Sequence, residues 1–470
     1  MLDDRVLDPP VTKTGHRIPE VDIVRGFALF GILICNAVAA VTQWSPDRAG
    51  SSGDRLVLAT VDALFSARFY PVFAFLFGYA FTLQVTAAVR VGASPAARLL
   101  RRCAVLMVVG LLHLFLLWDG DILTLYAALG VILVAVRALG PRSAALAGAT
   151  LSITWAMGTF LPGRLPGDGL RMPEVAYTGT AAETFAAQLT VAPTALLLVW
   201  AAGAVPSLAM FLFGLAAGKR NLLAQPNTGR TRVVLGAGLC AGLPLSALTF
   251  AATMQWWTPP PLLPGLQALV NPLMSFAYIA AVVLAARSPW ARRYCAVLAP
   301  AGRMAASNYI GQSIVLMVVY TGYGFALADD ASLGTVVAIG VLTFAAQLGL
   351  SHWWLRRHPY GPVEWVLRAG TYLTVPTWHL RSVDQSAGGR WNSARQRLRP
   401  EVSGRGTVST RIRVRSGMAK ESMSVRVRGQ GGPVVSAGRW MSAITSRVAL
   451  GASRFRMLVM AVVRTSGGRD

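Results

Sequence analysis

The sequence has few of the residues that bind metals or form disulfides. Its 470 residues include four cysteines and five histidines, and no pair of cysteines has CxxC spacing. The cysteines all lie within or at the ends of apolar runs, at Cys35, Cys103, Cys240 and Cys295. This distribution excludes a disulfide framework and a zinc site, so we expect no bound metal.

Signatures of nucleotide binding and of export are also missing. The sequence contains no Walker loop and no glycine-rich dinucleotide fingerprint. Residues 1–20 are polar, and the first apolar run after them is long and lacks a small-residue cleavage site. We therefore predict no cleavable signal peptide and expect that run to act as its own insertion signal.

Lysine is nearly absent, since Lys13, Lys219 and Lys420 are the only lysines among 44 basic residues. This preference for arginine is typical of GC-rich bacterial codon usage. Residues 1–380 hold 26 basic and 16 acidic residues, a balance of +10, whereas residues 381–470 hold 18 and 4, a balance of +14. Because most of the excess charge lies in the tail, we expect no nucleic-acid partner.

The tail, residues 381–470, is rich in Gly, Ser and Arg and shows no helical or strand period before about residue 436. We predict a basic, largely disordered cytoplasmic segment. Its last part, SRVALGASRFRMLVMAVVR, is too short and too basic to cross a membrane. A surface helix attracted to anionic lipid and an extension without function both remain open.

Long apolar runs dominate the rest of the chain. A spanning chain must satisfy its backbone hydrogen bonds internally, and the runs lack the alternation of an outer-membrane barrel. We therefore predict an all-α, polytopic helical bundle whose partner is the lipid bilayer. About ten spans are expected, at residues 24–43, 62–85, 103–118, 121–137, 143–161, 193–217, 233–252, 266–285, 304–327 and 332–354.

Basic and acidic residues alternate between the connections of these spans. Arg101, Arg137 and Arg303 belong to one set, and Asp54 and Asp119 belong to the other. The positive-inside rule places the first set, and with an even number of spans both termini, in the cytoplasm of a bacterium. The predicted parts are a cytoplasmic segment 1–20, an inner-membrane domain 21–380 and the tail 381–470.

The most informative stretch is residues 103–137, where two apolar runs meet at an acidic WDGD turn that contains Asp119 and Asp121. His113 lies inside the first run, and ionisable residues within spans are candidates for function. Histidine is a general base near neutral pH, and a carboxylate partner would fix its tautomer. The alternative is that His113 bonds one helix neighbour and the turn is a simple polar connection.

Asn36 is a candidate at the same depth. It lies eleven residues after Arg25, and His113 lies eleven residues after Arg102, so helix rise places both about 16 Å from the cytoplasmic boundary. If the two helices face each other, Asn36 could donate to the oxyanion that forms during acyl transfer.

Other polar residues are candidates for binding. Arg68 lies among aromatic residues and could hold an anion or pair with Asp62 or Asp121; interfacial snorkelling is the alternative. Asn308 and Gln312 are four residues apart, hence on one helix face. They could line the entry for a polar cofactor, or they could bond neighbouring helices.

Two further patterns concern packing. The tetrapeptide FLFG occurs at residues 75–78 and again at 211–214, which hints at two related halves. Glu364 and Arg368 are also four apart, and we expect an exposed helix pair just inside the membrane.

Five segments resemble the YeiB-like family of multipass bacterial membrane proteins, often labelled Domain of Unknown Function 418. They are DIVRGFALFGILICN at 22–36, RFYPVFAFLFGYAF at 68–81, GLLHLFLLWDGDILTLYA at 110–127, GRMAASNYIGQSIVLMVVYTGYGF at 302–325 and GPVEWVLRAGTY at 361–372. They occur in order across about residues 20–372, so the resemblance covers most of the chain.

The resemblance implies an activity, because this family is distantly similar to membrane acyltransferases such as heparan-alpha-glucosaminide N-acetyltransferase. Those enzymes move an acyl group from cytoplasmic acyl-CoA to an acceptor across the membrane. Arg25 and Gly26 are similar to their arginine-glycine start, and Asn36 matches a functional asparagine. The catalytic histidine that follows this asparagine in the N-acetyltransferase has no counterpart in AVAAVTQWSPD.

The leading hypothesis is therefore a membrane acyltransferase that takes acyl-CoA as co-substrate and modifies a lipid-linked, envelope or secreted acceptor. The predicted catalytic residues are His113, Asn36, Asp119 and Asp121, and the predicted binding residues are Arg25, Arg68, Asn308 and Gln312. A secondary transporter and a non-catalytic scaffold are the alternatives. A homo-oligomer is compatible with each of them.

Overall fold

The computed structural model divides the chain into two units, Met1–Leu380 and Arg381–Asp470, each considered by itself. In the first unit it describes residues 17–44, 51–160 and 170–379. In the second it describes the backbone of three strands. The predictions for residues 1–16 and for the last part of the tail lie outside the described residues.

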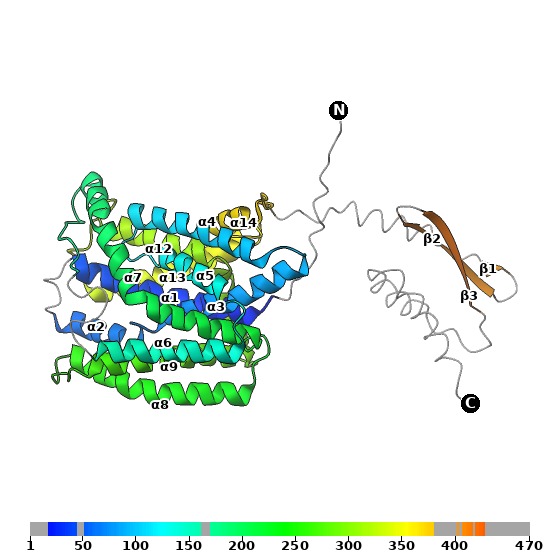
Figure 1. Cartoon of the computed structure of the whole chain (residues 1–470). Coiled ribbons are helices and arrows are strands. Elements are labelled where there is room, and N and C mark those ends of the chain that lie inside the picture. The colour runs from blue at the N-terminus through cyan, green and yellow to red at the C-terminus, as the bar shows by residue number, and fades with distance from the viewer. Residues whose placement is uncertain are drawn as a thin grey trace. The chain divides into compact units, whose positions relative to one another are not determined.

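The described part of the first unit consists of helices and their connections (Figure 1). In chain order the helices are α1 (Pro19–Trp44), α2 (Ser52–Leu64), α3 (Phe69–Arg90), α4 (Pro95–Leu116), α5 (Leu123–Ala135), α6 (Pro141–Thr159), α7 (Ala181–Lys219), α8 (Thr228–Thr253), α9 (Leu263–Arg287), α10 (Arg292–Ala296), α11 (Leu298–Arg303), α12 (Ala305–Tyr320), α13 (Leu333–Trp354) and α14 (Pro362–Tyr372).

Seven helical stretches among the described residues are long and apolar enough to cross a membrane, with α2 and α3 counted as one stretch. Helices α5 and α12 are also apolar but shorter. The prediction of an all-α membrane bundle is confirmed, and each predicted span overlaps a helix. The number ten and the cytoplasmic location of both termini stay predictions.

The predicted span at 62–85 falls within one candidate membrane stretch, Ser52–Arg90, which a turn divides into α2 and α3. Ala67 in this turn has a φ of 58°, in the left-handed region. The buried Arg68 donates from Nη1 to the carbonyl oxygens of Asp62 and Ser66, at 2.9 and 2.7 Å. The guanidinium thus satisfies backbone acceptors that the interrupted helix leaves open, which an apolar pattern does not reveal.

The two FLFG segments pack against each other, one from α3 and one from α7. A Cβ on Gly78 would lie 2.1 Å from the carbonyl oxygen of Phe211, and a Cβ on Gly214 would lie 2.0 Å from that of Phe75. Any larger side chain would force the helices apart, since small residues let membrane helices approach closely. The repeat is therefore a reciprocal contact between two helices.

A second close contact joins α1 to α11. A Cβ on Gly26 would lie 2.2 Å from the carbonyl oxygen of Leu298, and one on Gly302 would lie 1.9 Å from that of Asp22. Arg25 donates to Asp22 Oδ1 at 3.2 Å and to the Gly302 carbonyl at 3.4 Å. The arginine-glycine start of α1 thus seats it on α11.

The helices of this unit lie side by side around α1, most of whose residues are buried (Figure 1). Helices α6, α8 and α9 pack together at one edge, and α4 packs on α14 at the opposite edge. Helices α3, α5 and α7 lie between these edges, and α12 packs on α1, α13 and α14. The interior of this arrangement holds the polar groups described below.

The tail contains an antiparallel sheet in the order β1-β2-β3, formed by Val402–Ser403, Thr407–Ser416 and Ala419–Val427. Strands β2 and β3 pair from Val408 with Val427 to Ser416 with Ala419. The sequence predicted no strand period in this region. The alternation of arginine with Ile412 and Val414 in RIRVR is a period of two, short enough to be overlooked in an arginine-rich segment.

Candidate functional site

Three hydrogen-bonded side chains connect α4, the turn after it and α12. His113 Nδ1 lies 2.8 Å from Asp121 Oδ1, and His113 Nε2 lies 2.8 Å from Ser313 Oγ. All three residues are buried, and His113 is only 2% exposed. The structure therefore brings together His113 and Asp121, as the sequence predicted, and adds a hydroxyl on the other side of the imidazole.

Local structure holds these groups in place. The second carboxylate oxygen of Asp121 accepts the backbone N–H of Thr124 at 2.8 Å, in the first turn of α5, where negative charge is favoured. Helices α4 and α5 approach closely because Gly110 has no side chain; a Cβ there would lie 2.6 Å from the Thr124 nitrogen. The acidic turn is thus part of a rigid helical hairpin.

The partners determine the tautomer of His113. A carboxylate accepts hydrogen bonds, so the tautomer that satisfies both partners has Nδ1–H donating to Asp121 Oδ1 and Nε2 accepting from the Ser313 hydroxyl. The Tyr309 carbonyl, at 3.4 Å, is a second acceptor within reach of that hydroxyl. A serine hydroxyl beside an imidazole that a carboxylate orients is the arrangement that activates serine for acyl transfer in unrelated folds.

Asn36 and Asp119 lie apart from these three side chains. The Tyr70 hydroxyl donates to Asn36 Oδ1, and Gln43 Nε2 donates to Asp119 Oδ2 at 3.2 Å. Burial raises the pKa of the Asp119 carboxyl, and the Gln43 amide offsets part of this rise. Within the described residues neither side chain bonds His113, so the layer predicted to hold Asn36 and His113 involves no direct contact.

Arg68 is a buried structural group in the turn between α2 and α3. Its Nη2 donates to Ser246 Oγ at 3.2 Å, and its Nη1 reaches the backbone of Asp62 rather than the carboxylate. Its Nε has no hydrogen-bond partner within the described residues. The predicted pairing with Asp121 is not found in that part of the chain.

Asn308 and Gln312 fasten α12 to α13. Asn308 Nδ2 donates to Ser351 Oγ at 2.9 Å, and Gln312 Nε2 donates to Gln347 Oε1 at 3.0 Å. Gln347 Nε2 in turn donates to the Asn308 carbonyl at 3.0 Å. Neither residue lines the two cavities described below, so the geometry favours interhelical bonding over the predicted substrate contact.

A cavity of about 340 Å³, which we call the basic cavity, lies beside the first turns of α12. Arg25, Arg102, Arg303 and Arg368 line it, together with Tyr309. The Nε atoms of Arg102 and Arg303 are buried without a hydrogen-bond partner in the part of the chain that the structure describes. Burial lowers the pKa of the Arg303 guanidinium. The cavity thus presents donors that lack acceptors.

Tyr309 connects this cavity with the histidine. Its ring lines the basic cavity, and its centroid lies 5.1 Å from that of His113. Its hydroxyl donates to the carbonyl of Gly120 in the acidic turn at 3.3 Å. The His113 side chain lines neither cavity, so the Tyr309 ring stands between the basic cavity and the imidazole.

Glu364 holds the helix that carries Ser313. Its carboxylate accepts the backbone N–H groups of Ala306 and Ser307, at 2.7 and 3.3 Å, and the Ser307 hydroxyl at 2.5 Å. The expectation of an exposed Glu364–Arg368 pair was wrong. Helix α14 packs on α4 and α12, so the carboxylate caps the first turn of α12, where amide donors are otherwise unpaired.

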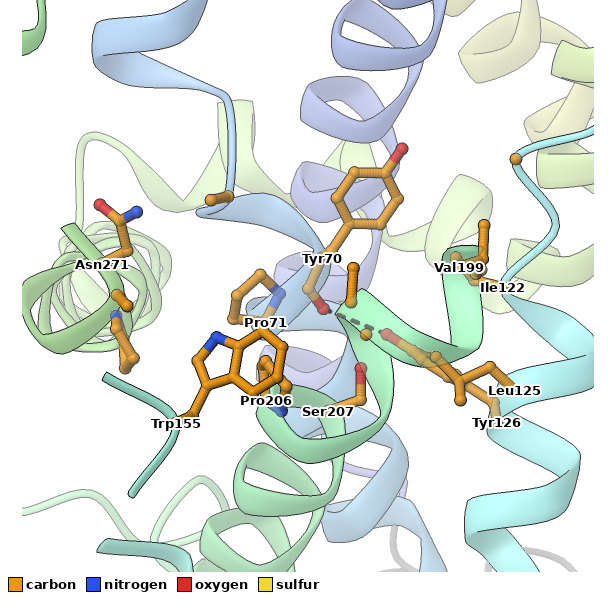
Figure 2. Close-up of a pocket in the computed structure, with 16 residues that line it drawn as sticks. Tyr70, Pro71, Ile122, Leu125, Tyr126, Trp155, Val199, Pro206, Ser207 and Asn271 are labelled. Carbon is orange, nitrogen blue, oxygen red and sulfur yellow. Dashed lines mark hydrogen bonds between the residues drawn. The ribbon is translucent and has the colours of Figure 1, made fainter. Parts of the chain in front are cut away.

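A second cavity, of about 400 Å³, lies among α3, α5, α6, α7 and α9, and we call it the apolar cavity (Figure 2). Its wall includes Pro71, Pro206 and Trp155, which Figure 2 shows close together. Tyr126 lines both cavities, and its hydroxyl donates to the Tyr70 carbonyl at 3.2 Å (Figure 2). The two cavities thus meet at one side chain.

Several of these residues were not among the predicted site residues. Ser313 follows Gln312 directly, and only the packing of α12 against α4 shows that it faces His113. In the sequence Arg303 was assigned to the cytoplasmic set of basic residues, and Arg102 marked the cytoplasmic boundary of its span. Within the described residues, no group of three or more His, Cys, Asp or Glu side chains could hold a metal ion.

Comparison with known proteins places the chain among proteins of undetermined activity. Residues 217–374 match the family model for a protein of unknown function (DUF418). The chain is 27% identical over 401 residues to the uncharacterized protein YxaH of Bacillus subtilis, which covers 77% of this chain and 96% of that protein. It is 26% identical over 381 residues to the uncharacterized protein YeiB of Escherichia coli, covering 74% and 94%.

A third relative is an uncharacterized 39.9 kDa protein in the amylase 3' region of Bacillus acidopullulyticus, 27% identical over 373 residues, covering 76% of this chain and 94% of that protein. Together these findings confirm the resemblance to the YeiB-like family. None of these names states an activity, so the resemblance to acyltransferases stays a prediction.

Proposed function

We propose that this YeiB-like chain is an acyltransferase of the bacterial cytoplasmic membrane that takes acyl groups from acyl-CoA. The observation that carries the proposal is the buried sequence of hydrogen bonds from Asp121 through His113 to Ser313, with both heavy-atom distances at the imidazole equal to 2.8 Å. A hydroxyl held against a carboxylate-oriented imidazole is a recurring arrangement for acyl transfer through serine.

In the proposed reaction, Ser313 Oγ attacks the thioester carbonyl carbon while its proton passes to His113 Nε2. The C–S bond breaks, and the leaving sulfur takes that proton from Nε2. An acceptor hydroxyl or amine then attacks the acyl-serine, its proton moves to Nε2 and on to Ser313 Oγ, and the ester bond breaks. Asp121 stays ionised and stabilises the imidazolium during both transfers.

The basic cavity supports acyl-CoA as donor. Coenzyme A carries phosphate groups, and guanidinium groups bind phosphate through charge-assisted hydrogen bonds. Arg102 and Arg303 each offer a buried Nε without a partner in the described residues. The predicted topology places this cavity at the cytoplasmic side, where acyl-CoA is found. Tyr309 must turn aside for the thioester to reach Ser313, which makes this ring a gate in the proposal.

The test is release of free thiol from acetyl-CoA by purified protein in lipid nanodiscs. We expect His113→Gln and Ser313→Ala to lower the rate by about 10²- to 10⁴-fold, the range of a general base or nucleophile. Mass spectrometry of wild-type protein should find an acetyl group on Ser313, which is absent in the His113→Gln variant.

Two matched variants control for lost packing. Ser275→Ala removes another buried serine hydroxyl, in α9, which donates to the Arg68 carbonyl at 2.8 Å, and His358→Gln removes a buried histidine whose Nδ1 lies 2.7 Å from the Trp378 carbonyl. Both should keep the wild-type rate. Equal rates in Ser313→Ala and Ser275→Ala would exclude a serine intermediate.

A secondary transporter is the second candidate, favoured by proline residues in α3, α7 and α9 that line one cavity. Interrupted membrane helices around a central cavity are typical of transporters. Transport predicts accumulation of a solute in vesicles with no consumption of thioester, and replacement of Ser313 would leave that flux unchanged.

A further inference from the structure

The apolar cavity contains backbone acceptors that two helices leave without donors. Pro206 in α7 and Pro272 in α9 have no N–H, so the carbonyls four residues earlier, at Ala202 and Ala268, lose their helical donors. Each carbonyl lies on the helix face between its own residue and the proline. All four residues line the cavity, so these carbonyls belong to its wall.

A side-chain acceptor is found in the same wall. Asn271, directly before Pro272, lines the cavity, and its Oδ1 is buried without a hydrogen-bond partner within the described residues. Figure 2 shows its side chain on the α9 wall, opposite Val199 and Ile122. An unpaired buried acceptor is costly, and a bound donor removes that cost.

The remaining lining identifies the chemistry of the occupant. None of the described residues that line this cavity carries a charge, so a bound cation would lack a counter-charge. Tyr70, Tyr126 and Trp155 supply flat apolar faces. An occupant with hydroxyl donors at its edges and C–H groups on its faces, as in a pyranose ring, matches both properties.

We propose that the apolar cavity binds a neutral, hydroxyl-rich group, such as a sugar ring, through the Ala202 and Ala268 carbonyls and Asn271 Oδ1. Within the proposed function, on which this role rests, that group is the acyl acceptor. The cavity includes Gly120 and Ile122, which flank Asp121, so its occupant lies next to the turn that orients His113. A free sugar and the head of a glycolipid share this chemistry.

Photolabelling in nanodiscs tests the site directly. One probe is an octyl glucoside with a diazirine in its alkyl tail, and the matched probe has the same tail on a methyl-capped ethylene glycol head without donors. We expect saturable labelling of the lining segments of α7 and α9 by the glucoside alone. Competition by unlabelled alkyl maltoside but not by free glucose would identify a lipid-linked source, and competition by both would identify a free one.

Proline variants supply matched controls. Pro206→Ala and Pro272→Ala return an N–H to the unpaired carbonyls. We therefore expect the glucoside concentration at half-maximal labelling to rise about three- to tenfold, which corresponds to one hydrogen bond in a membrane protein. Pro193→Ala in the same α7 and Pro244→Ala in α8 alter prolines outside the cavity and should bind as wild type. Asn271→Leu removes the side-chain acceptor and leaves the backbone hydrogen bonds unchanged.

The result also separates this site from the acyltransferase reaction, because labelling needs no acyl-CoA. Equal labelling by both probes would contradict the proposed binding site even if thiol is released from acetyl-CoA. The same glucoside concentration at half-maximal labelling in all four proline variants would also contradict it. Specific glucoside labelling without thiol release would keep the site and overturn the acyltransferase proposal.

Discussion

The basic and apolar cavities meet at Tyr126 but have opposite hydrogen-bonding needs. Among the described residues, the Nε donors of Arg102 and Arg303 at the basic cavity have no acceptor, whereas Asn271 Oδ1 at the apolar cavity has no donor. A charged, acceptor-rich ligand suits the first cavity, and a neutral, donor-rich ligand suits the second. In a membrane interior, unpaired polar groups are costly, so each set indicates the chemistry of its missing partner.

The largest effect is expected at the close contact between α3 and α7. Helix α3 lines both cavities, and Gly78 and Gly214 set its spacing from α7, which lines the apolar cavity. Gly214→Val should force the helices apart and destabilise the protein by about 3 kcal/mol, with loss of binding in both cavities. The measurement is thermal unfolding in nanodiscs. Gly236→Val, at a position with open space around it, is the control, and equal melting temperatures would contradict the close contact.

A smaller effect should separate the cavities. Arg102→Gln or Arg303→Gln should raise the Kd of coenzyme A about 10- to 150-fold, because a charge-assisted hydrogen bond contributes roughly 1.5 to 3 kcal/mol. Glucoside labelling of the apolar cavity should not change. Arg287→Gln removes the same charge from a residue that pairs with Glu20 at 3.4 Å, outside the basic cavity. A similar rise in the Kd of coenzyme A for Arg287→Gln would show that the effect comes from the net charge of the protein rather than from contacts in the basic cavity.

A change at the shared wall should join the cavities. Tyr126→Ala removes the ring that lines both, so we expect water to reach the acyl group and thioester hydrolysis without acceptor to rise several-fold. Tyr126→Phe keeps the ring and removes only the hydroxyl that donates to the Tyr70 carbonyl. Thiol release without acceptor should therefore rise in the alanine variant alone; a rise in both would assign the effect to the hydrogen bond.

The smallest expected effect is a pH dependence of stability that arises from one residue of the basic cavity. Burial raises the pKa of Glu364, which lines the basic cavity, above its ordinary 4.5. The folded protein then binds this proton more readily than the unfolded chain does, so the contribution of Glu364 to the free energy of unfolding grows as pH falls through the folded pKa toward 4.5.

The measurement is the difference in melting temperature between wild type and Glu364→Gln, followed from about pH 8 to about pH 5. We expect the difference to move in favour of wild type as pH falls. The control is Asn271→Leu in the apolar cavity, whose lining contains no carboxyl group. Its difference from wild type should stay constant, and a constant difference for Glu364→Gln would contradict the prediction.

The sequence predicted part of the site because some contacts are local along the chain. His113 and Asp121 are eight residues apart across one helical hairpin, and an acidic turn after a histidine-bearing span is visible without a structure. Ser313 is 200 residues from His113, and nothing near it in the sequence marks it as a partner. Helix α12, which carries Ser313, is held by Glu364 and by bonds to α13, which are contacts between residues 35 to 58 positions apart.

The sequence by itself determined the membrane class, the helical content and the family resemblance, because long apolar runs have few structural solutions in a bilayer. It also predicted that a carboxylate of the acidic turn lies near His113, and Asp121 does. Only the tertiary structure decided that Asn308 and Gln312 bond α13, that Arg68 satisfies a broken helix, and that two FLFG segments touch each other. These outcomes follow from how polar groups on different helices find partners once water is absent, and that pairing is a property of the packed bundle rather than of any single helix.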